Sequence, residues 1–351
     1  MEKIIETQEL LEKLKLLQPG IANKDFIEST THYFFTGTHI ITYNDKICIS
    51  VPFEIDSKPF SIKAVDFYKV IQGIKEETFN YNIDDNAFLI KAKKTKAKIK
   101  INTEDFMLKE MFDKLDIPSK KPTALKDPKS FKKGMNLCKY STSQSAHDII
   151  LFCVYFAPDM IASTDNYRVS IYNIKEKIKP FLLPVTVIDE LAKFEFEAIH
   201  VGDNWVYFFC EDEVVFAARR IAGEFKDVKG AVKSANVIST INLPESLPYV
   251  LKDLEAMAKE DEKIVFFSIK KNSMSIKAEK ELGWLMKKID IEYDGENLSF
   301  HINMSFLFRI VTRLQEMKVC EDRILFEMDN FIHMISLHDN DEETEKDIDD
   351  E

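Results

Sequence analysis

The stretch PFSIKAVDFYKVIQGI, residues 59–74, and the run FNYNIDDNAFLIKA from Phe79 decide the fold of this chain. Their pattern, an amphipathic helix that leads into a β-rich run, returns twice at nearly constant spacing. The second copy reads PFLLPVTVIDELAKF from Pro180 and FEAIHVGDNWVYFF from Phe196. The third reads SFHINMSFLFRIVTRL from Ser299 and ILFEMDNFIHMISL from Ile324, so three similar pieces follow one another.

A matching first half precedes each copy. Helix candidates at residues 7–17, 130–140 and 247–258 lead into paired strands that start at Tyr33, Val154 and Phe266. Short repeats of about 20 to 50 residues stack into solenoids, whereas units of about 120 residues can each bury a core of their own. We therefore predict three domains at 1–122, 123–242 and 243–338, joined by proline-containing linkers, and a disordered acidic tail at 339–351.

The helices and strands of each repeat show separate periods. In the helix after Lys63, Phe67, Ile71 and Ile74 share one face, as helical spacing requires. In the third copy, Leu307 and Ile310 face inward while Arg309 and Arg313 lie outside, one turn apart. The predicted fold class is α+β, with two helices of each domain packed on antiparallel sheet.

Composition and charge narrow the class of protein. The chain has 351 residues, is 45% hydrophobic and 31% charged, and shows neither a membrane-length apolar run nor a signal-peptide core, so we expect a cytoplasmic protein with no membrane partner. Its net charge of −12 argues against nucleic-acid binding. Much of that charge sits in the last thirteen residues, however, and the rest of the chain is much closer to neutral.

Motifs for catalysis, metals and cofactors are missing from the sequence. The five cysteines form no Cys-x-x-Cys pair, and the histidines show no metal-binding spacing. The glycines form neither a dinucleotide fingerprint nor a phosphate-binding loop, and Ser145, His147 and Asp148 read as a polar loop rather than a catalytic triad. We predict a protein that is not an enzyme, with no catalytic residues, no metal and no cofactor.

Three local segments resemble the bacterial-type β sliding clamp, the processivity factor of DNA polymerase III. IASTDNYRVS, residues 161–170, is similar to the family's Ala-Thr-Asp-Gly-His-Arg-Leu. AARRIAGEFKDV, residues 217–228, resembles Ser-Arg-Leu-Ile-Glu-Gly-x-Phe-Pro-Asp-Tyr, and FIHMISL, residues 331–337, resembles Val-Val-Met-Pro-Met-Arg-Leu. Lys226 replaces a proline, which marks a divergent member. The Lys-, Ile-, Asn- and Phe-rich composition favours an AT-rich genome, such as that of a bacteriophage.

The resemblance implies a head-to-tail homodimer that forms a six-domain ring around duplex DNA, with a peptide groove between domains two and three. Polymerase and clamp loader would bind in this groove through short peptides, for which a partly apolar cleft is suited. Carried onto this chain, the groove comprises Leu151, Thr164, Tyr167, Arg168, Val169, Lys226, Ala231, Ile332, Met334 and Ile335. The turn at TDNYR is also expected from its Asp-Asn pair alone.

The DNA-facing surface of such a ring carries basic residues on outward helix faces and nearby loops. Contacts of this kind reach phosphates, so binding is independent of sequence and sensitive to salt. Ordinary solvated helix faces explain single lysines equally well. The candidates are Lys13, Lys15, Lys24, Lys69, Lys132, Lys133, Lys139, Gln144, His147, Arg309 and Arg313.

The run KAKKTKAKIKI predicts a strand with one basic face, because lysines alternate with other residues. A charged edge strand usually prevents aggregation, but the resemblance places this edge at the subunit interface. We expect acidic residues of domain three to face it around an apolar centre. The predicted interface comprises Lys96, Lys98, Ile99, Lys100, Met257, Ala258, Glu260 and Glu262.

The resemblance thus implies a DNA sliding clamp that tethers the replicative DNA polymerase and other replication proteins. An alternative is a ring or scaffold protein with the clamp fold that binds peptides without encircling DNA, because a fold alone does not fix a function.

Overall fold

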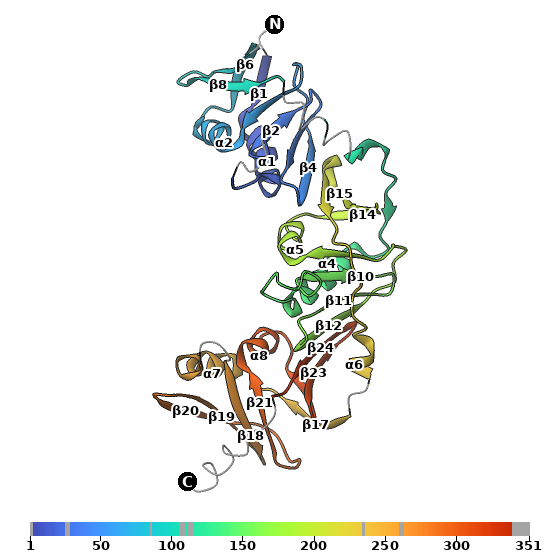
Figure 1. The fold of residues 1–351 in the computed structure, drawn as a ribbon. Coiled ribbons are helices and arrows are strands. Elements are labelled where there is room, and N and C mark those ends of the chain that lie inside the picture. The colour runs from blue at the N-terminus through green and yellow to red at the C-terminus, as the bar shows by residue number, and fades with distance from the viewer. Residues whose placement is uncertain are drawn as a thin grey trace. The chain divides into compact units, whose positions relative to one another are not determined.

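The fold follows one series of elements that occurs three times, as a computed structural model shows (Figure 1). The structure describes residues 3–24, 29–84, 86–104, 110, 115–233, 236–259 and 263–338. Each series is a helix, three strands, a fourth strand, a second helix and three further strands. The fold class predicted from the sequence is confirmed, and the paired strands expected in the first half of each copy are in fact triplets.

The bounds of the three series are as follows. The first has α1 (Thr7–Leu16), β2 (His32–Phe35), β3 (His39–Tyr43), β4 (Ile47–Pro52), β5 (Phe60–Lys63), α2 (Ala64–Gly73), β6 (Thr78–Asp84), β7 (Ala87–Lys91) and β8 (Lys96–Asn102). The second has α4 (Pro128–Cys138), β10 (Cys153–Phe156), β11 (Met160–Thr164), β12 (Arg168–Asn173), β13 (Phe181–Pro184), α5 (Val185–Leu191), β14 (Phe196–Val201), β15 (Trp205–Cys210) and β16 (Val215–Arg219). The third has α7 (Leu247–Leu254), β18 (Ile264–Lys270), β19 (Ser273–Lys280), β20 (Gly283–Asp290), β21 (Leu298–Asn303), α8 (Met304–Val311), β22 (Glu316–Cys320), β23 (Arg323–Met328) and β24 (Phe331–Ser336).

Short strands precede the series, and each pairs with the first strand after the second helix. They are β1 (Lys3–Glu6) on β6, β9 (Thr123–Ala124) on β14, and β17 (Val237–Asn242) on β22. A short helix, α6 (Lys229–Lys233), precedes β17. In the third series, β22 starts at Glu316, earlier than the Ile324 expected from the sequence, because Met317 is already a core residue with no exposed surface.

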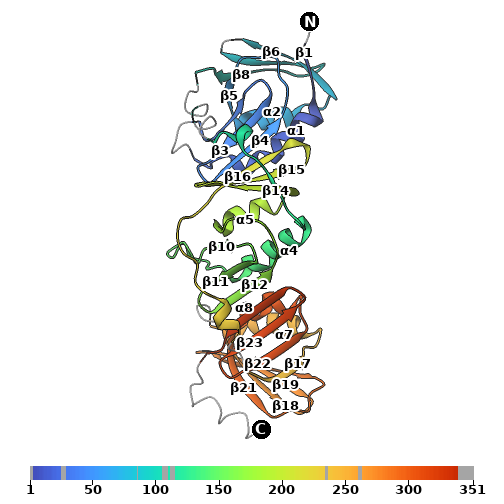
Figure 2. The same cartoon turned by 90° about the vertical axis from the view of Figure 1, so that its right-hand side faces the viewer.

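The chain divides into two compact units, Met1–Lys132 with Glu176–Ala222, and Lys133–Lys175 with Gly223–Glu351. The first unit holds an antiparallel sheet of order β1-β6-β7-β8-β5-β2-β3-β4-β16-β15-β14-β9. Figure 2 shows β16, β15 and β14 continuing from β4. The second unit holds the run β10-β11-β12-β24-β23-β22-β17 and a four-stranded sheet, β20-β19-β18-β21. The three-domain boundaries and the acidic tail stay predictions, and the tail lies outside the described residues.

Aromatic rings hold corresponding places in the cores of the first and third series. Phe35 stacks on Phe60 with ring centres 4.7 Å apart, and Phe267 stacks on Phe300 at 5.2 Å. Both pairs join the first strand of a series to its fourth. All four rings are buried, and burying such a side chain contributes about 1.5–3 kcal/mol. Phe60 and Phe300, each the second residue of the quoted repeat segments PFSIKAVDFYKVIQGI and SFHINMSFLFRIVTRL, therefore pack in equivalent ways.

The helices bury the faces that their periodicity predicts. In α2, Phe67 and Ile71 are fully buried, and in α8 Leu307, Ile310 and Val311 are buried. The α8 helix begins after Asn303, whose side-chain oxygen accepts a 3.1 Å hydrogen bond from the Phe306 N–H, a favourable N-cap. No helix among the described residues is both long and apolar enough to cross a membrane.

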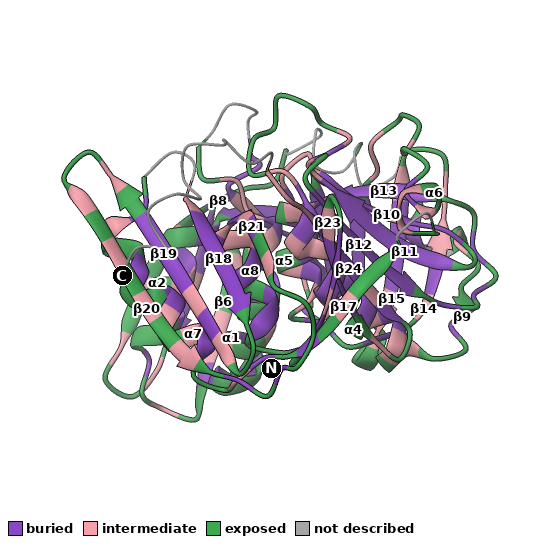
Figure 3. Cartoon of the chain, turned by 90° about the horizontal axis from the view of Figure 1, so that it is seen from below, coloured by how far each residue is buried: buried purple, intermediate pink, exposed green. Residues whose placement is uncertain are grey.

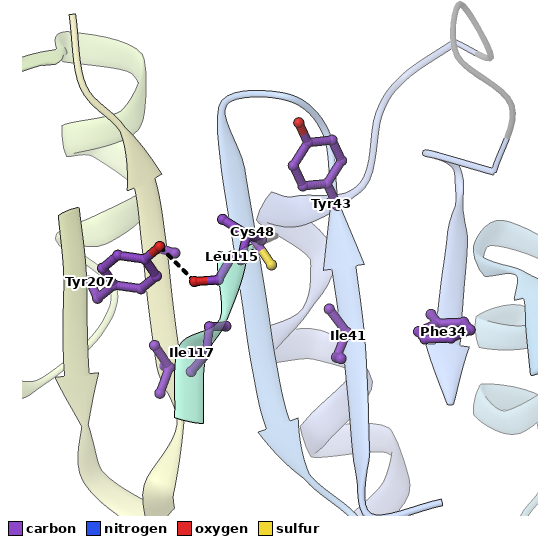
Figure 4. Close-up of a cluster of buried hydrophobic side chains, with 9 residues drawn as sticks. Phe34, Ile41, Tyr43, Cys48, Leu115, Ile117 and Tyr207 are labelled. Atoms are coloured by element: carbon purple, nitrogen blue, oxygen red, sulfur yellow. Dashed lines mark hydrogen bonds between the residues drawn. The ribbon is translucent and has the colours of Figure 1, made fainter. Parts of the chain in front are cut away.

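A further buried apolar cluster lies on the sheet that the first and second series share. Tyr43 and Cys48 of the first series and Tyr207 and Ala217 of the second belong to one buried cluster, with Leu115 packed among them. Figure 4 shows the Tyr207 hydroxyl donating a 2.9 Å hydrogen bond to the Leu115 carbonyl oxygen. This burial raises the pKa of Tyr207 to about 12, so its hydroxyl stays protonated and remains a donor.

Candidate functional site

The predicted peptide groove lies around the junction of β12 and β24 in the second unit. The antiparallel register places Val169 opposite Met334 and Arg168 opposite Ile335. Val169 and Met334 belong to one apolar cluster with Val228, and Ala231 of α6 packs against it. Residues about 165 positions apart in the sequence are thus neighbours, and they come from the three segments that carry the resemblance.

Two aromatic residues that the sequence analysis did not single out complete this cluster. Tyr155 of β10 and Phe225 of the loop before α6 stack with ring centres 4.7 Å apart and planes 12° from parallel. Both rings are only partly buried and pack against the same cluster as Ala231. A polarizable Met334 beside half-exposed rings is the surface that short peptides with apolar anchors prefer. No periodic pattern identifies Phe225, because it lies in a loop.

The TDNYR turn is held by its own aspartate. The Asp165 carboxylate accepts the backbone N–H of Tyr167 at 3.1 Å and that of Arg168 at 2.8 Å. Asn166 has a φ of 76°, a conformation that asparagine tolerates better than most residues. Tyr167 remains 58% exposed, and Lys226 donates a 2.6 Å hydrogen bond from Nζ to Asn166 Oδ1. The turn predicted from Asp-Asn is present, and Lys226 contacts it directly.

Arg168 occupies a different place from the open groove wall that the sequence analysis expected. Its side chain is 1% exposed, and its guanidinium holds Asp165 through Nε at 3.0 Å and Nη2 at 2.7 Å. On its other side, Cζ lies 3.9 Å from the centre of the Phe306 ring of α8. Burial lowers the pKa of Arg168, but the adjacent Asp165 opposes that shift. Arg168 therefore fixes the turn and has no surface to offer a ligand.

The remaining groove candidates are held by local contacts. Thr164 ends β11 and accepts the Asn166 N–H at 3.1 Å, while Ile332 is half-buried opposite Ile171. Leu151 is buried in a turn whose Asp148 carboxylate accepts its N–H, and it is not a member of the apolar cluster. Arg323, which the sequence analysis missed, donates to the Ala231 carbonyl oxygen and lies 3.6 Å from Met334 Sδ.

The DNA-facing candidates divide into two groups. Lys13 is paired with Glu9, Lys132 with Glu195 and Lys133 with Asp329, so their charges are partly balanced within the chain. Arg313 donates a 2.7 Å hydrogen bond to the Tyr140 hydroxyl and stacks on that ring, which Lys139 also approaches. The exposed candidates outside these pairs are Lys15, Lys24, Lys69, Gln144, His147 and Arg309.

The predicted interface residues that the structure describes fall on the strand β8 and on the segment after α7. Lys96, Lys98 and Lys100 are exposed on β8, and Ile99 between them is half-buried. Met257 lies half-buried beside Gly283 of β20, whereas Ala258 is buried within its own unit. Glu260 and Glu262 lie outside the described residues. Asp253 is paired with Lys287 and Glu255 with Lys263, so these two acids already have lysine partners.

Metal-binding groups do not gather in the part of the chain that the structure describes. No three His, Cys, Asp or Glu side chains among the described residues are placed to hold a metal ion. Burial raises the pKa of Cys48 and of Cys153 to about 12, which keeps both thiols protonated and unreactive.

The architecture and the site together define the sliding-clamp fold, and comparison with solved structures bears this out. The β subunit of DNA polymerase from Streptococcus pyogenes is similar with a TM-score of 0.82 at 16% identity, covering 96% of this chain and 99% of that one. A DNA polymerase sliding clamp from Bacillus subtilis gives 0.81 at 16% identity, covering 96% and 98%. The DNA polymerase III β subunit from Pseudomonas aeruginosa gives 0.80 at 14%, covering 97% and 100%.

Sequence comparison adds no closer relative. No protein-family model matches the chain, and no curated protein matches its sequence. At this level of identity the structural likeness establishes the fold, which is that of the DNA polymerase III β subunit over nearly the whole chain. The resemblance read from the three local segments is therefore confirmed as a likeness of fold. The clamps named here come from bacteria, and the phage origin stays a prediction.

Proposed function

We propose that this protein is a DNA sliding clamp, a non-enzymatic processivity factor that works in the cytoplasm as a homodimeric ring. The observation that carries the proposal is the near-complete likeness to three solved β clamps, each covered over 98% or more of its length. The likeness extends over 96–97% of this chain.

A rule of strand pairing supports the ring. The third strand of one series pairs with the last strand of the next, as β4 pairs with β16 and β12 with β24. By the same rule, β20, the third strand of the third series, is expected to pair with the last strand of a further series. In the described residues β20 is the outer strand of its sheet, and β8 pairs with β5 only at Ile101 and Asn102. Two chains satisfy both edges when β20 of each pairs with β8 of the other, which closes a head-to-tail ring.

The β20 edge has the exposed apolar residues of an interface. Figure 3 shows β20 alternating between intermediate and exposed residues. Its exposed positions include Trp284, 53% exposed, and Met286, 38% exposed, and Leu282 in the preceding turn is 87% exposed. Large apolar side chains on an open strand edge are an aggregation hazard unless a partner covers them. A second copy of the chain is the partner that the pairing rule supplies.

DNA is the ligand proposed for the ring, and peptides are the ligands proposed for the groove. Lys15, Lys69 and Arg309 are exposed on α1, α2 and α8, which suits weak, sequence-independent contact with phosphates. The groove formed by Tyr167, Lys226 and the cluster around Met334 suits peptides of a DNA polymerase and of a clamp loader. Such peptides would insert apolar side chains beside Phe225 and an acidic group beside Lys226.

A clamp-fold scaffold that binds peptides without encircling DNA is the second candidate. One observation favours it, since Lys13, Lys132 and Lys133 are paired with carboxylates of the same chain and have less charge to offer DNA. The two candidates differ in the salt dependence of duplex binding. A clamp loses affinity steeply as salt rises, whereas a scaffold shows no DNA affinity at any salt.

The ring itself is tested by solution mass combined with particle images. At 40.8 kDa per chain, the proposed dimer has twice that mass and appears in images as a closed ring with a central hole. A monomer at all concentrations, or an open filament of chains, would contradict the proposal.

A further inference from the structure

Six exposed lysines gather on the outward side of β7, β8 and the turn between them. They are Lys91, Lys93, Lys94, Lys96, Lys98 and Lys100, here called the lysine face. The strand register puts Lys91 directly opposite Lys96, where like charges repel. In the part of the chain that the structure describes, none of the six forms an ion pair. The Glu76 carboxylate accepts the backbone N–H of Lys94 at 2.8 Å and is the one acid that the structure places against the described part of this face. On a chain with a net charge of −12, such a concentration of positive charge suits an acidic partner.

The chemistry of this face favours an acidic peptide over a nucleic acid. Phe88 and Ile90 point into the core, so their strand neighbours share the outward side with the lysines. The residues directly opposite Lys98 and Lys100 are Leu89 and Ala87, and Asn82 lies beyond Leu89. These neighbours offer no aromatic ring on which a base would stack. Carboxylates at regular spacing are the better match.

The chain supplies such carboxylates at its own C-terminus. Residues 339–351 hold nine acidic side chains and one lysine. Every odd-numbered position is acidic, and the sequence of these positions is Asp339, Asp341, Glu343, Glu345, Asp347, Asp349 and Glu351. In an extended chain, alternate side chains lie on one side about 6.7 Å apart, the same spacing as that of Lys96, Lys98 and Lys100 on β8.

The last described residue, His338, lies at the β21 edge of the sheet whose opposite edge is β20. The His338 N–H donates a 3.0 Å hydrogen bond to the His301 carbonyl oxygen of β21, which lies in one four-stranded sheet with β20. Three strand spacings amount to about 14 Å, whereas thirteen extended residues reach about 45 Å. The segment is long enough to pass β20 and cross a strand laid against it.

We infer that the acidic C-terminal segment 339–351 of one copy docks on the lysine face of a second copy. The inference rests on the proposed head-to-tail ring, in which β20 of one copy meets β8 of the other. It gives β8 an acidic partner in addition to the predicted Glu260 and Glu262, which lie outside the described residues. The contact adds a salt-sensitive attraction across each junction and favours the head-to-tail orientation over any other.

Isotope-mixed cross-linking tests this contact directly. Full-length protein labelled with ¹⁵N is diluted together with unlabelled protein, reconcentrated and treated with a carbodiimide, which joins a lysine to a carboxylate in contact. The docked arrangement yields linked peptides that join residues 339–351 of one label to Lys96, Lys98 or Lys100 of the other. Links of a single label only, or no links in a sample whose mass shows mixed dimers, overturn the inference. A sample without dimers contradicts the proposed function instead.

A matched set of variants gives a second readout. Replacing Lys96, Lys98 and Lys100 by glutamate is expected to weaken the dimer about 10-fold at low salt in the full chain, and to have little effect in a chain that ends at His338. Lys175, Lys177 and Lys179 are exposed at the same spacing and serve as the control triple, for which no change is expected. Equal weakening with and without the tail overturns the inference. So does a lysine variant that loses only oligonucleotide binding, since the occupant is then nucleic acid.

Discussion

Arg168 lies over the ring of Phe306, with its Cζ 3.9 Å from the ring centre, while its guanidinium binds Asp165 in the turn that precedes β12. One side chain thereby joins a strand of the second series to helix α8 of the third. The Arg168 side chain is buried, so water cannot take the place of its partners around the guanidinium charge. The shape of the predicted peptide groove depends on this interaction, because Tyr167 and Asn166 sit on the turn that it fixes.

Replacing Arg168 by alanine is therefore expected to destabilise the protein by about 3–5 kcal/mol, since it leaves the Asp165 carboxylate, whose side chain is 9% exposed, without a cationic partner. Chemical unfolding measures the change. Arg313→Ala is the control, because that guanidinium also stacks on a ring, Tyr140, but is exposed, and we expect a cost below about 1 kcal/mol. Equal costs for the two variants would show that Arg168 does not organise the turn.

Lys226 occupies the position where the clamp family carries proline, and its amino group reaches Asn166. We expect Lys226→Pro to weaken binding of peptides with an acidic residue beside their apolar anchor by about 5- to 10-fold, and to leave uncharged peptides unaffected. Calorimetry with a series of acidic and uncharged peptides ranks them by affinity. Lys233→Met, at an exposed lysine of α6, is the control. An unchanged ranking in Lys226→Pro removes the proposed preference.

The basic residues on the helices are expected to differ in importance. Lys15→Ala with Lys69→Ala removes two exposed charges, so the plot of log affinity against log salt for duplex DNA should become shallower by about 0.9 for each phosphate that is no longer neutralised. Lys132→Ala is expected to have a smaller effect, because Lys132 is paired with Glu195. Fluorescence anisotropy over a salt series measures both. A larger effect for Lys132 than for Lys15 and Lys69 would contradict the idea that lysines paired with carboxylates contribute less to DNA binding.

His333 on β24 is expected to make stability depend on pH. Its Nδ1 lies 2.8 Å from the Ser170 hydroxyl, and its Nε2 has no hydrogen-bond partner among the described residues. Burial, followed by the charge of Arg168, lowers the pKa of His333 to about 3. The unfolded chain binds a proton near pH 6.5. Between about pH 6.5 and 3 the unfolded state therefore holds the extra proton, and stability falls with decreasing pH by up to about 1.4 kcal/mol per unit.

His333→Gln removes this titration, so its unfolding midpoint should fall less between pH 7 and pH 5 than that of the parent. Denaturant unfolding at the two pH values supplies the comparison. His200→Gln is the control, because it makes the same substitution at a histidine that is not buried in the core and whose Nδ1 lies 3.0 Å from the Lys121 carbonyl oxygen. A parent and a His333 variant with the same pH slope would show that His333 is not the group responsible.

Sequence periodicity predicted the helices, their buried faces and the threefold repeat, because local spacing carries that information. Phe67, Ile71 and Leu307 follow helical periods and are core residues. Partners far apart in the sequence escaped prediction. Lys132 pairs with Glu195 and Arg168 with Phe306, and nothing in the local pattern of either residue points to its partner. The site was located through motif resemblance, while the roles of Arg168 and Phe225 needed the three-dimensional structure.

The topology of the DNA substrate gives the most direct test of clamp function. Labelled protein is assembled on nicked circular duplex, separated from free protein by gel filtration at moderate salt, and then divided into samples with and without a restriction enzyme that linearises the circle. A clamp stays with the circle and dissociates within minutes of linearisation, because it slides off the ends. Equal retention on circular and linear DNA, or no retention on either, would contradict the proposal that this protein encircles DNA.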